Sequence, residues 1–111
     1  MSVELNIATQ FSQFPFGRYP DHGPDNGQRF RDELLAPALR ENDEVTVDLT
    51  GARGLAPSFL EEAFGGLVRL GFTLAELRQR LHVVSKTDPS LVTEVFAYIE
   101  DEAARIGAPG H

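Results

Sequence analysis

The sequence predicts one α/β domain in which a mixed central sheet of about four to five strands carries about three to four packed helices. Two observations favour this class. Segments with the two-residue alternation of strands are separated by segments whose apolar residues recur at helical spacing. The chain has 111 residues, of which 41% are hydrophobic, enough to fill the core of one domain. Strands that alternate with helices predict right-handed crossovers.

The strands are predicted from the alternation of apolar and polar residues. Val3, Leu5 and Ile7 alternate with polar neighbours, so the chain opens with a strand. Residues 44–49 alternate in the same way and are rich in β-branched side chains, which favour strands. Residues 81–85 form a short apolar run, which is typical of a buried strand. Two further strands complete the predicted sheet: residues 9–14, which extend the first strand or pair with it, and the short segment 17–19.

A first long helix is expected over residues 27–40, where apolar side chains fall at helical spacing. Asp25 and Asn26 are both available as its N-cap. Pro37 lacks a backbone N–H and is therefore expected to kink the helix or to split it.

A second long helix is expected over residues 58–70, where apolar side chains occupy nearly half of the circumference. Ser58 and Glu61 have the spacing of a capping box, which predicts a helix start at Ser58. Gly65 and Gly66 each weaken a helix by about 1 kcal/mol relative to alanine. Close packing of the backbone is expected there as compensation.

Two shorter signals complete the helices. Thr73 and Glu76 repeat the capping-box spacing before a short helix over residues 74–80. Asp88 and Pro89 supply an N-cap and a first-turn proline for a last helix.

Composition limits the environment and the partners. The chain has no cysteine, which excludes disulfides and thiolate zinc sites and indicates a cytoplasmic protein. Residues 1–6 do not resemble a signal peptide, and no segment reaches the roughly 20 apolar residues of a membrane span. The net charge of −7 disfavours nucleic acid. We expect one domain over residues 1–106, a flexible C-terminal tail over residues 107–111, and no contact with nucleic acid or membrane.

Several segments resemble known families. Residues 45–50 resemble the strand of STAS domains in anti-sigma factor antagonists, where V-x-V-D-L-[ST] precedes a helix that starts with D-S-S-G. Here residues 56–59 read A-P-S-F, so the second serine position is kept. A closer resemblance joins residues 58–67, which read S-F-L-E-E-A-F-G-G-L, to a bacterial family of STAS-like domains of unknown function. G-R-Y at 17–19 and F-R-D-E-L-L at 30–35 match the same family.

The resemblance implies a function through protein–protein contact. In the anti-sigma factor antagonists, the serine that matches Ser58 accepts a phosphate from a kinase-like ATPase, and this modification switches partner binding. The expectation is a non-enzymatic regulatory module that binds an ATP-binding kinase-like or anti-sigma-like protein, with Ser58 as the candidate phosphoacceptor. As an ordinary helix cap, Ser58 would instead contribute about 1 kcal/mol to stability. The candidate binding residues are Gly17, Arg18, Tyr19, Arg31, Ser58 and Glu62.

Further expectations concern the surroundings of Arg18. A pair between Arg18 and Glu62 would tie the N-terminal loop to the second long helix. Arg18, Arg29 and Arg31 form either a patch for an anion or an acidic partner, or surface salt bridges with nearby aspartates. Aromatic residues in a small domain usually serve the core, but exposed members of one cluster would form a docking surface. That cluster consists of Phe11, Phe14, Phe16 and Tyr19.

Two other classes of function stay open. A small molecule, anion or nucleotide would bind through Arg18, Ser58 and the N–H groups of the helix that starts at Ser58. An enzyme outside the known motifs would need a closed pocket containing Glu62 or His82 with a strongly shifted pKa. The sequence contains no P-loop, no G-x-G-x-x-G and no G-x-S-x-G, and His22 has no partner at metal-ligand spacing. We expect no enzymatic activity, no cofactor and no metal, and a monomer or weak dimer.

Overall fold

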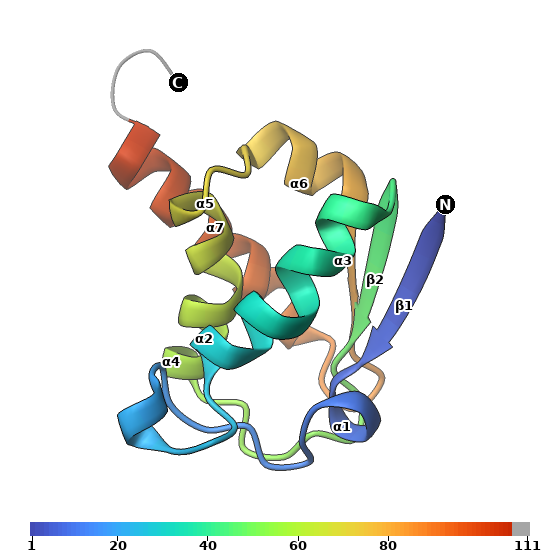
Figure 1. Cartoon of the computed structure of the whole chain (residues 1–111), viewed down its shortest axis with the longest axis vertical. Coiled ribbons are helices and arrows are strands. Elements are labelled where there is room, and N and C mark those ends of the chain that lie inside the picture. Colours follow the sequence, from blue (N-terminus) through green and yellow to red (C-terminus); the bar gives the residue numbers. More distant parts are fainter. Residues whose placement is uncertain (108–111) are drawn as a thin grey trace.

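Three parallel strands form the sheet of the protein. The computed structural model describes residues 1–107. The strands lie side by side in the order β1 (Ser2–Asn6), β2 (Glu44–Asp48) and β3 (Leu81–Val84), as Figure 1 shows. The central strand β2 pairs in parallel with both neighbours. Parallel pairing requires a long crossover between consecutive strands, and helices supply it in each case.

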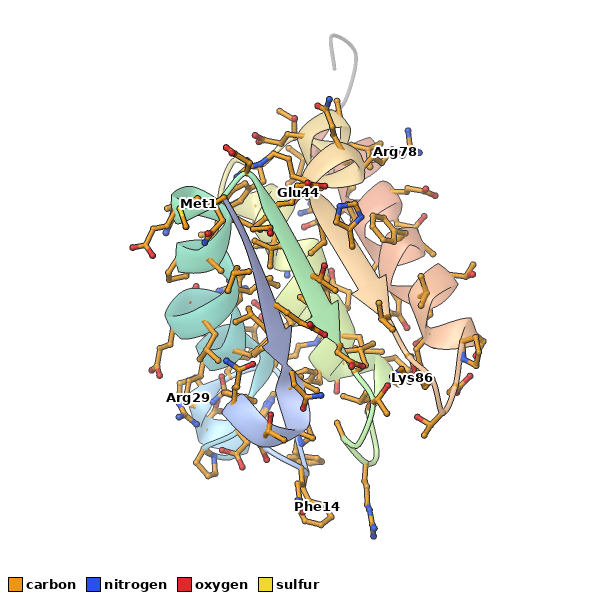
Figure 2. The ribbon with its side chains drawn as sticks, turned by 90° about the vertical axis from the view of Figure 1, so that its right-hand side faces the viewer. Met1, Phe14, Arg29, Glu44, Arg78 and Lys86 are labelled. Carbon is orange, nitrogen blue, oxygen red and sulfur yellow. The ribbon has the colours of Figure 1, made fainter. Side chains whose placement is uncertain are left out.

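One face of the sheet is buried and the other is open. Val45 and Val47 of β2 are fully buried and lie beside apolar residues of β1 and β3 in the register. Glu4, Thr46 and His82 form a row on the opposite face, where Glu4 and His82 are exposed. Figure 2 shows the strands in front and the two long helices behind them, so both long helices cover the same face of the sheet. A parallel sheet with one open face is unusual, because parallel sheets are generally covered on both sides.

The predicted mixed sheet of about four to five strands is wrong for residues 1–107, which contain three strands that all pair in parallel. Residues 9–14 do not extend β1, because the chain turns into helix α1 (Ile7–Gln10). The Asn6 side chain caps this helix by accepting a hydrogen bond from the Thr9 N–H at 3.0 Å. Gly17 has a φ of +79°, a left-handed conformation that interrupts an extended chain, so residues 17–19 form a loop.

The first long helix is continuous and contains a π turn. It comprises α2 (Gly27–Phe30), the π turn η2 (Arg31–Leu35) and α3 (Ala36–Glu41). Its N-cap is Asn26, whose side chain accepts from the Arg29 N–H at 2.9 Å. The distortion predicted at Pro37 takes the form of the π turn, in which the Ala36 N–H donates to the Arg31 carbonyl five residues earlier. The wider turn accommodates the proline ring, which would otherwise clash with the carbonyl one turn before it.

The second long helix starts one residue earlier than predicted. It comprises α4 (Pro57–Leu60), the π turn η3 (Glu61–Gly65) and α5 (Gly66–Arg69). The predicted capping box of Ser58 and Glu61 is wrong, because Ala56 is the N-cap and the N-cap makes no side-chain hydrogen bond. Pro57 occupies the first helical position, where its fixed φ suits the helix and its missing N–H costs nothing. Ser58 is therefore the second residue of the helix.

Of the two remaining helices, the first begins as predicted, and the second begins at Ser90, one residue after Pro89, which was predicted for its first turn. Helix α6 (Leu74–Arg80) starts with the predicted capping box: the Thr73 N–H donates to Glu76 at 2.7 Å and the Glu76 N–H donates to Thr73 at 3.1 Å. Helix α7 (Ser90–Gly107) includes Gly107, which the sequence places in the tail. The rest of the predicted tail, residues 108–111, lies outside the described residues. None of the helices in residues 1–107 is long and apolar enough to cross a membrane.

The two long helices approach each other closely at Gly27. Phe30 and Phe59 are fully buried between them, with ring centroids 6.1 Å apart. A Cβ atom at Gly27 would lie 2.8 Å from the Phe59 carbonyl oxygen and 3.0 Å from the Glu62 Cβ. Glycine at this position therefore sets the distance between the helices.

We predict that Gly27→Ala lowers the free energy of unfolding by about 1–3 kcal/mol, because the added methyl group forces the Phe59 backbone away. Urea unfolding measures the loss. The matched control is Gln28→Ala at the neighbouring, half-buried position, which we expect to stay within about 0.5 kcal/mol of the wild-type protein. Equal effects of the two substitutions would contradict the close approach.

Candidate functional site

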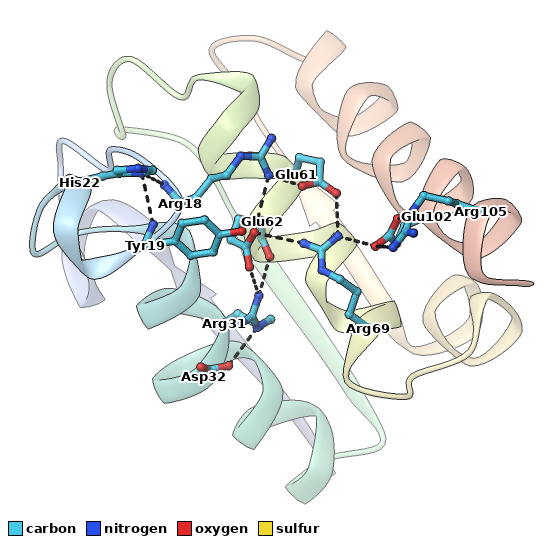
Figure 3. Close-up of polar contacts among 10 residues, drawn as sticks. All are labelled: Arg18, Tyr19, His22, Arg31, Asp32, Glu61, Glu62, Arg69, Glu102 and Arg105. Atoms are coloured by element: carbon cyan, nitrogen blue, oxygen red, sulfur yellow. Dashed lines mark hydrogen bonds and ion pairs between the residues drawn. The ribbon is translucent and has the colours of Figure 1, made fainter.

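Arg18 ties the N-terminal loop (residues 12–26) to the second long helix, as Figure 3 shows. Its guanidinium donates to the Glu61 carboxylate and lies 3.6 Å from the Glu62 carboxylate. The Arg18 side chain is 34% exposed, whereas that of Glu62 is 6% exposed. The predicted pair between Arg18 and Glu62 is confirmed, and Glu61 is an additional acceptor.

Arg31 meets Glu62 in the protein interior. The Arg31 Nη1 atom donates to Glu62 Oε2 at 2.6 Å and to the Glu62 carbonyl at 3.0 Å. The Arg31 Nε atom donates to Asp32 at 2.9 Å. The side chains of Arg31 and Glu62 are both almost fully buried. A buried charge without a partner is strongly unfavourable, so each of these residues requires the other.

Arg69 extends these contacts to helix α7. It bonds to Glu61 at 3.1 Å, to Glu62 at 3.2 Å and also to Glu102. Glu102 in turn accepts from Arg105 at 2.6 Å and 2.9 Å. We call the connected set the Glu62 cluster; it consists of Arg18, Arg31, Asp32, Glu61, Glu62, Arg69, Glu102 and Arg105. Its formal charges cancel, and in residues 1–107 every buried side-chain nitrogen or oxygen has a hydrogen-bond partner.

The electrostatics of the cluster favour its charged forms. Burial opposes ionisation of Glu61, but bonds from Arg69 and Arg18 hold its pKa below its usual value. Burial alone would lower the pKa of Arg69, yet the bonds to Glu61 and Glu102 raise it. Hydrogen bonds from Arg105, and then from Arg69, lower the pKa of Glu102 to about 2. In each of these three groups, the oppositely charged neighbours outweigh burial and favour the charged form.

Two adjacent glycines provide the space for the cluster. A Cβ atom at Gly66 would lie 3.0 Å from Cδ of Arg31 and would clash with its guanidinium. At Gly65 it would lie 2.7 Å from the Glu61 carboxylate and 3.5 Å from the Tyr98 carbonyl in α7. The closest neighbours of this glycine pair are thus the charged side chains of Arg31 and Glu61 rather than the backbone predicted, and the α7 backbone lies at ordinary contact distance. The absence of side chains at Gly65 and Gly66 leaves room for these two charged residues.

The two π turns supply the charged residues of the central pair. Arg31 is the first residue of η2, and Glu61 and Glu62 are the first two residues of η3. A π turn widens the helix and changes the direction in which its side chains project, and such turns are frequent at functional sites. The ion pair between the two long helices therefore forms at the two π turns.

The conformation of the N-terminal loop is fixed by backbone hydrogen bonds. The Gly27 N–H donates to the Gly17 carbonyl and the Gln28 N–H donates to the Arg18 carbonyl, each at 2.9 Å. The His22 Nδ1 atom accepts from the Arg18 N–H at 3.0 Å. A Cβ atom at Gly17 would lie 2.5 Å from the His22 Cβ, so this tight turn requires glycine.

Aromatic side chains of the same loop face solvent. Phe14 is 61% exposed, Phe16 is 63% exposed and Tyr19 is 42% exposed. Phe11 instead packs edge-on against Phe30, with ring centroids 5.2 Å apart. The predicted aromatic cluster is thus divided between one half-buried member and three exposed members. Large exposed aromatic groups on an ordered loop are a feature of interaction surfaces.

The structure brings together some of the predicted site residues and separates others. Arg18, Arg31 and Glu62 meet in the Glu62 cluster, and Tyr19 follows Arg18 on the exposed side of the loop. Ser58 is partly exposed and lies one helical turn before Glu62, outside the cluster. The arginine patch is divided in the same way, because Arg31 is buried against Glu62 while Arg29 makes a surface pair with Asp25 at 3.1 Å.

Sequence reasoning missed Arg69, Glu102 and Arg105. One signal was available: Arg69 follows Glu62 by two helical turns and so lies on the same side of the helix. The three-residue spacing of Glu102 and Arg105 was also visible. Their contact with Arg69 depends on the packing of α7 against the second long helix, which no local pattern reveals.

Other candidate groups stand apart from the cluster. His82 bonds to Glu44 at 2.8 Å on the open face of the sheet. In residues 1–107, histidine, aspartate and glutamate do not form a group of three or more that could hold a metal ion.

A scan against protein-family models matches residues 26–91, more than half of the chain, to the STAS-like domain of unknown function. The chain belongs to this family. The match confirms the resemblance found in the sequence, and it contains Arg31, Ser58 and Glu62, whereas residues 17–19 precede it. A search of curated proteins and a search of solved structures each found no match to this STAS-like domain.

Because Glu62 neutralises buried Arg31, we predict that Glu62→Gln lowers the free energy of unfolding by about 3–5 kcal/mol. Urea unfolding is the measurement. The control is Glu33→Gln, which removes an exposed pair with Arg29 and should change stability by less than about 1 kcal/mol. A small effect of Glu62→Gln would show that the ion pair does not hold the helices together.

The depressed pKa of Glu102 predicts a dependence of stability on pH. Its folded pKa of about 2 lies below the ordinary value of 4.5, so ionised Glu102 stabilises the fold above about pH 4.5, and this contribution is lost as the pH falls toward 2. We expect Glu102→Gln to be less stable than wild type at neutral pH, and the difference to shrink between about pH 5 and about pH 2. Urea titrations at several pH values test this. A difference that does not depend on pH would refute the assignment.

Proposed function

We propose that this STAS-like domain is a non-enzymatic regulatory module that works by binding another protein. The observation that carries the proposal is the N-terminal loop, where Phe14, Phe16 and Tyr19 are exposed on a backbone held by hydrogen bonds. Aromatic anchors supply much of the binding energy at protein interfaces. A loop that is already ordered loses little conformational entropy when a partner binds it.

The attachment of the loop supports this proposal. Arg18 is the residue between the exposed Phe16 and Tyr19 positions that reaches inward, and it bonds to the Glu61 carboxylate. The aromatic groups therefore project from a loop that is fixed to the second long helix. A loop that served solely as a connection would not need a partly buried ion pair to hold it, because connections usually tolerate motion.

The proposed partner is an ATP-binding, kinase-like protein or an anti-sigma-like protein. Family membership and the resemblance of residues 45–50 to the strand of anti-sigma factor antagonists support this choice. A cytoplasmic location and a monomeric or weakly dimeric state belong to the same proposal, as does the absence of nucleic acid from the interface. The net charge of −7 supports the last point.

We further propose that phosphorylation of Ser58 gates this contact. Ser58 is partly exposed in the first turn of the helix, one turn before Glu61 and Glu62. A phosphate there would add about −1.5 to −2 charges. It would repel Glu61 and Glu62 and attract Arg18, which is the most exposed of the three cations that contact Glu62. Phosphorylation would therefore alter the electrostatic interactions through which Arg18 holds the loop to the helix.

The alternative of an anion, nucleotide or small-molecule site at the same helix start has less support. Arg18, its proposed cation, is engaged with two carboxylates. Binding an anion would require Arg18 to leave Glu61, or to accept a further negative charge beside it.

A pull-down from a native lysate tests the proposal. We expect the wild-type domain and Ser58→Ala to retain an ATP-binding protein that mass spectrometry identifies. We expect Phe16→Ser and Ser58→Glu to lose it, because the first removes an aromatic anchor and the second introduces the charge of a phosphate. Binding should then be repeated with the purified partner.

The matched control is Leu70→Ser, which removes another exposed apolar side chain; Leu70 is 43% exposed and follows the C-terminal end of the second long helix, whereas Ser58 lies at its start. It should retain the partner. Unfolding curves of all variants separate loss of binding from loss of fold. Capture that is unchanged in Phe16→Ser, or the absence of any ATP-binding protein from the wild-type sample, would contradict the proposal.

A further inference from the structure

The outer edge of β1 carries unpaired backbone groups. The Glu44 N–H donates to the Met1 carbonyl, and the register places Ser2 opposite Glu44. In a parallel ladder, the backbone groups of alternate residues point to opposite sides, so those of Val3 and Leu5 face β2. The N–H and C=O groups of Ser2 and Glu4 therefore point away from the sheet. Within residues 1–107, no other strand lies beyond β1.

One backbone group on this edge of β1 already has a hydrogen-bond partner. The Asn6 N–H, which points to the same side, donates to the Gln10 side chain at 2.6 Å. This bond closes the end of the edge where β1 runs into α1. The part of β1 available for pairing is thus the segment around Glu4.

The open face beside this edge is acidic. Alternation places Glu4, Glu44 and Asp48 on that face, and Glu44 is labelled there in Figure 2. His82 is the basic side chain of the same face, and it is engaged with Glu44. The register places no lysine or arginine among the outward-facing residues of the three strands described here. If a strand were added to β1, its side chains on the open face would therefore lie in the negative potential of these carboxylates.

These charges decide between the possible occupants of the edge. A second copy of the chain would pair β1 with β1 around a two-fold axis, and the register that uses the whole strand places Glu4 opposite Glu4 of the second copy. Like charges directly opposite each other destabilise a sheet. Charged residues on edge strands are a known means of preventing such self-pairing. A segment with a basic residue opposite Glu4 is favoured for the same electrostatic reason.

We propose that the free edge of β1 is a second interaction surface, which binds an extended segment of a partner protein with lysine or arginine at alternate positions. The segment adds a fourth strand to the sheet, and its backbone pairs with Ser2 and Glu4. Its basic side chains lie over the acidic open face beside Glu4. This surface is separate from the aromatic loop, so it does not depend on the function proposed above.

The test uses the full chain, labelled with ¹⁵N, and two synthetic peptides. One alternates valine and lysine, and the other has the same residues with the lysines grouped at one end. We expect the alternating peptide to bind severalfold more tightly, to shift the amide resonances of β1 and to slow hydrogen exchange of the Glu4 N–H. Equal affinity for the two peptides, shifts located elsewhere, or no binding would overturn the proposal.

Two variants separate the backbone contribution from the charge. Ser2→Pro removes an outward-facing N–H without a loss of pairing to β2, so the fold should persist while peptide binding weakens. Glu4→Lys should reverse the preference, so that a peptide alternating valine and glutamate binds better than the lysine peptide. Glu4→Thr should increase self-association in sedimentation velocity, because the repulsion between copies is removed. Unchanged binding by Ser2→Pro, or an unchanged preference in Glu4→Lys, would refute strand addition at this edge.

Discussion

The buried ion pair between Arg31 and Glu62 is the interaction on which the rest of the structure depends. It joins the two long helices, each of which belongs to a different crossover of the sheet. The pair is possible because Gly66 leaves room for the Arg31 side chain, and Gly27 lets the helices come close enough for it to form. Removing either charge would leave the other without a partner in the interior. The distance between the helices, the positions of the two glycines and the positions of the two charges therefore depend on one another.

The same carboxylate also determines how the surface is organised. Because Glu62 is shared by Arg18, Arg31 and Arg69, the loop that carries Arg18 is connected directly to the core. The exposed aromatic side chains of Phe14 and Phe16 belong to this same loop. The open face of the sheet carries polar and acidic side chains, so its chemistry differs from that of the aromatic loop. The aromatic loop and the open sheet face are therefore two surfaces of different chemistry on one small domain.

Much of the fold could be predicted from sequence, because periodicity identifies strands such as residues 44–49 and helices such as α7. The predicted extra strands failed where one side chain or one backbone angle decides the outcome: Asn6 caps a helix, and Gly17 turns the chain. The pair of Arg18 with Glu62 was predictable because both residues belong to recognisable motifs. The contribution of Glu102 was not, since it depends on how α7 packs. The π turns could not be predicted either, because no residue pattern distinguishes them from an ordinary α-helix.

The parallel arrangement of the strands has a consequence for the way the chain folds. Ser2 pairs with Glu44 and Val45 pairs with Leu81, so every strand contact joins residues that are distant in sequence. A hairpin cannot nucleate this sheet, and loop-closure entropy must be overcome before any strand pairing is gained. Helical segments can form early, but the ion pairs between the two long helices form only when both crossovers have packed against the sheet. The barrier to folding is therefore expected to be dominated by topology, and the molecule should fold more slowly than a helical bundle of the same length.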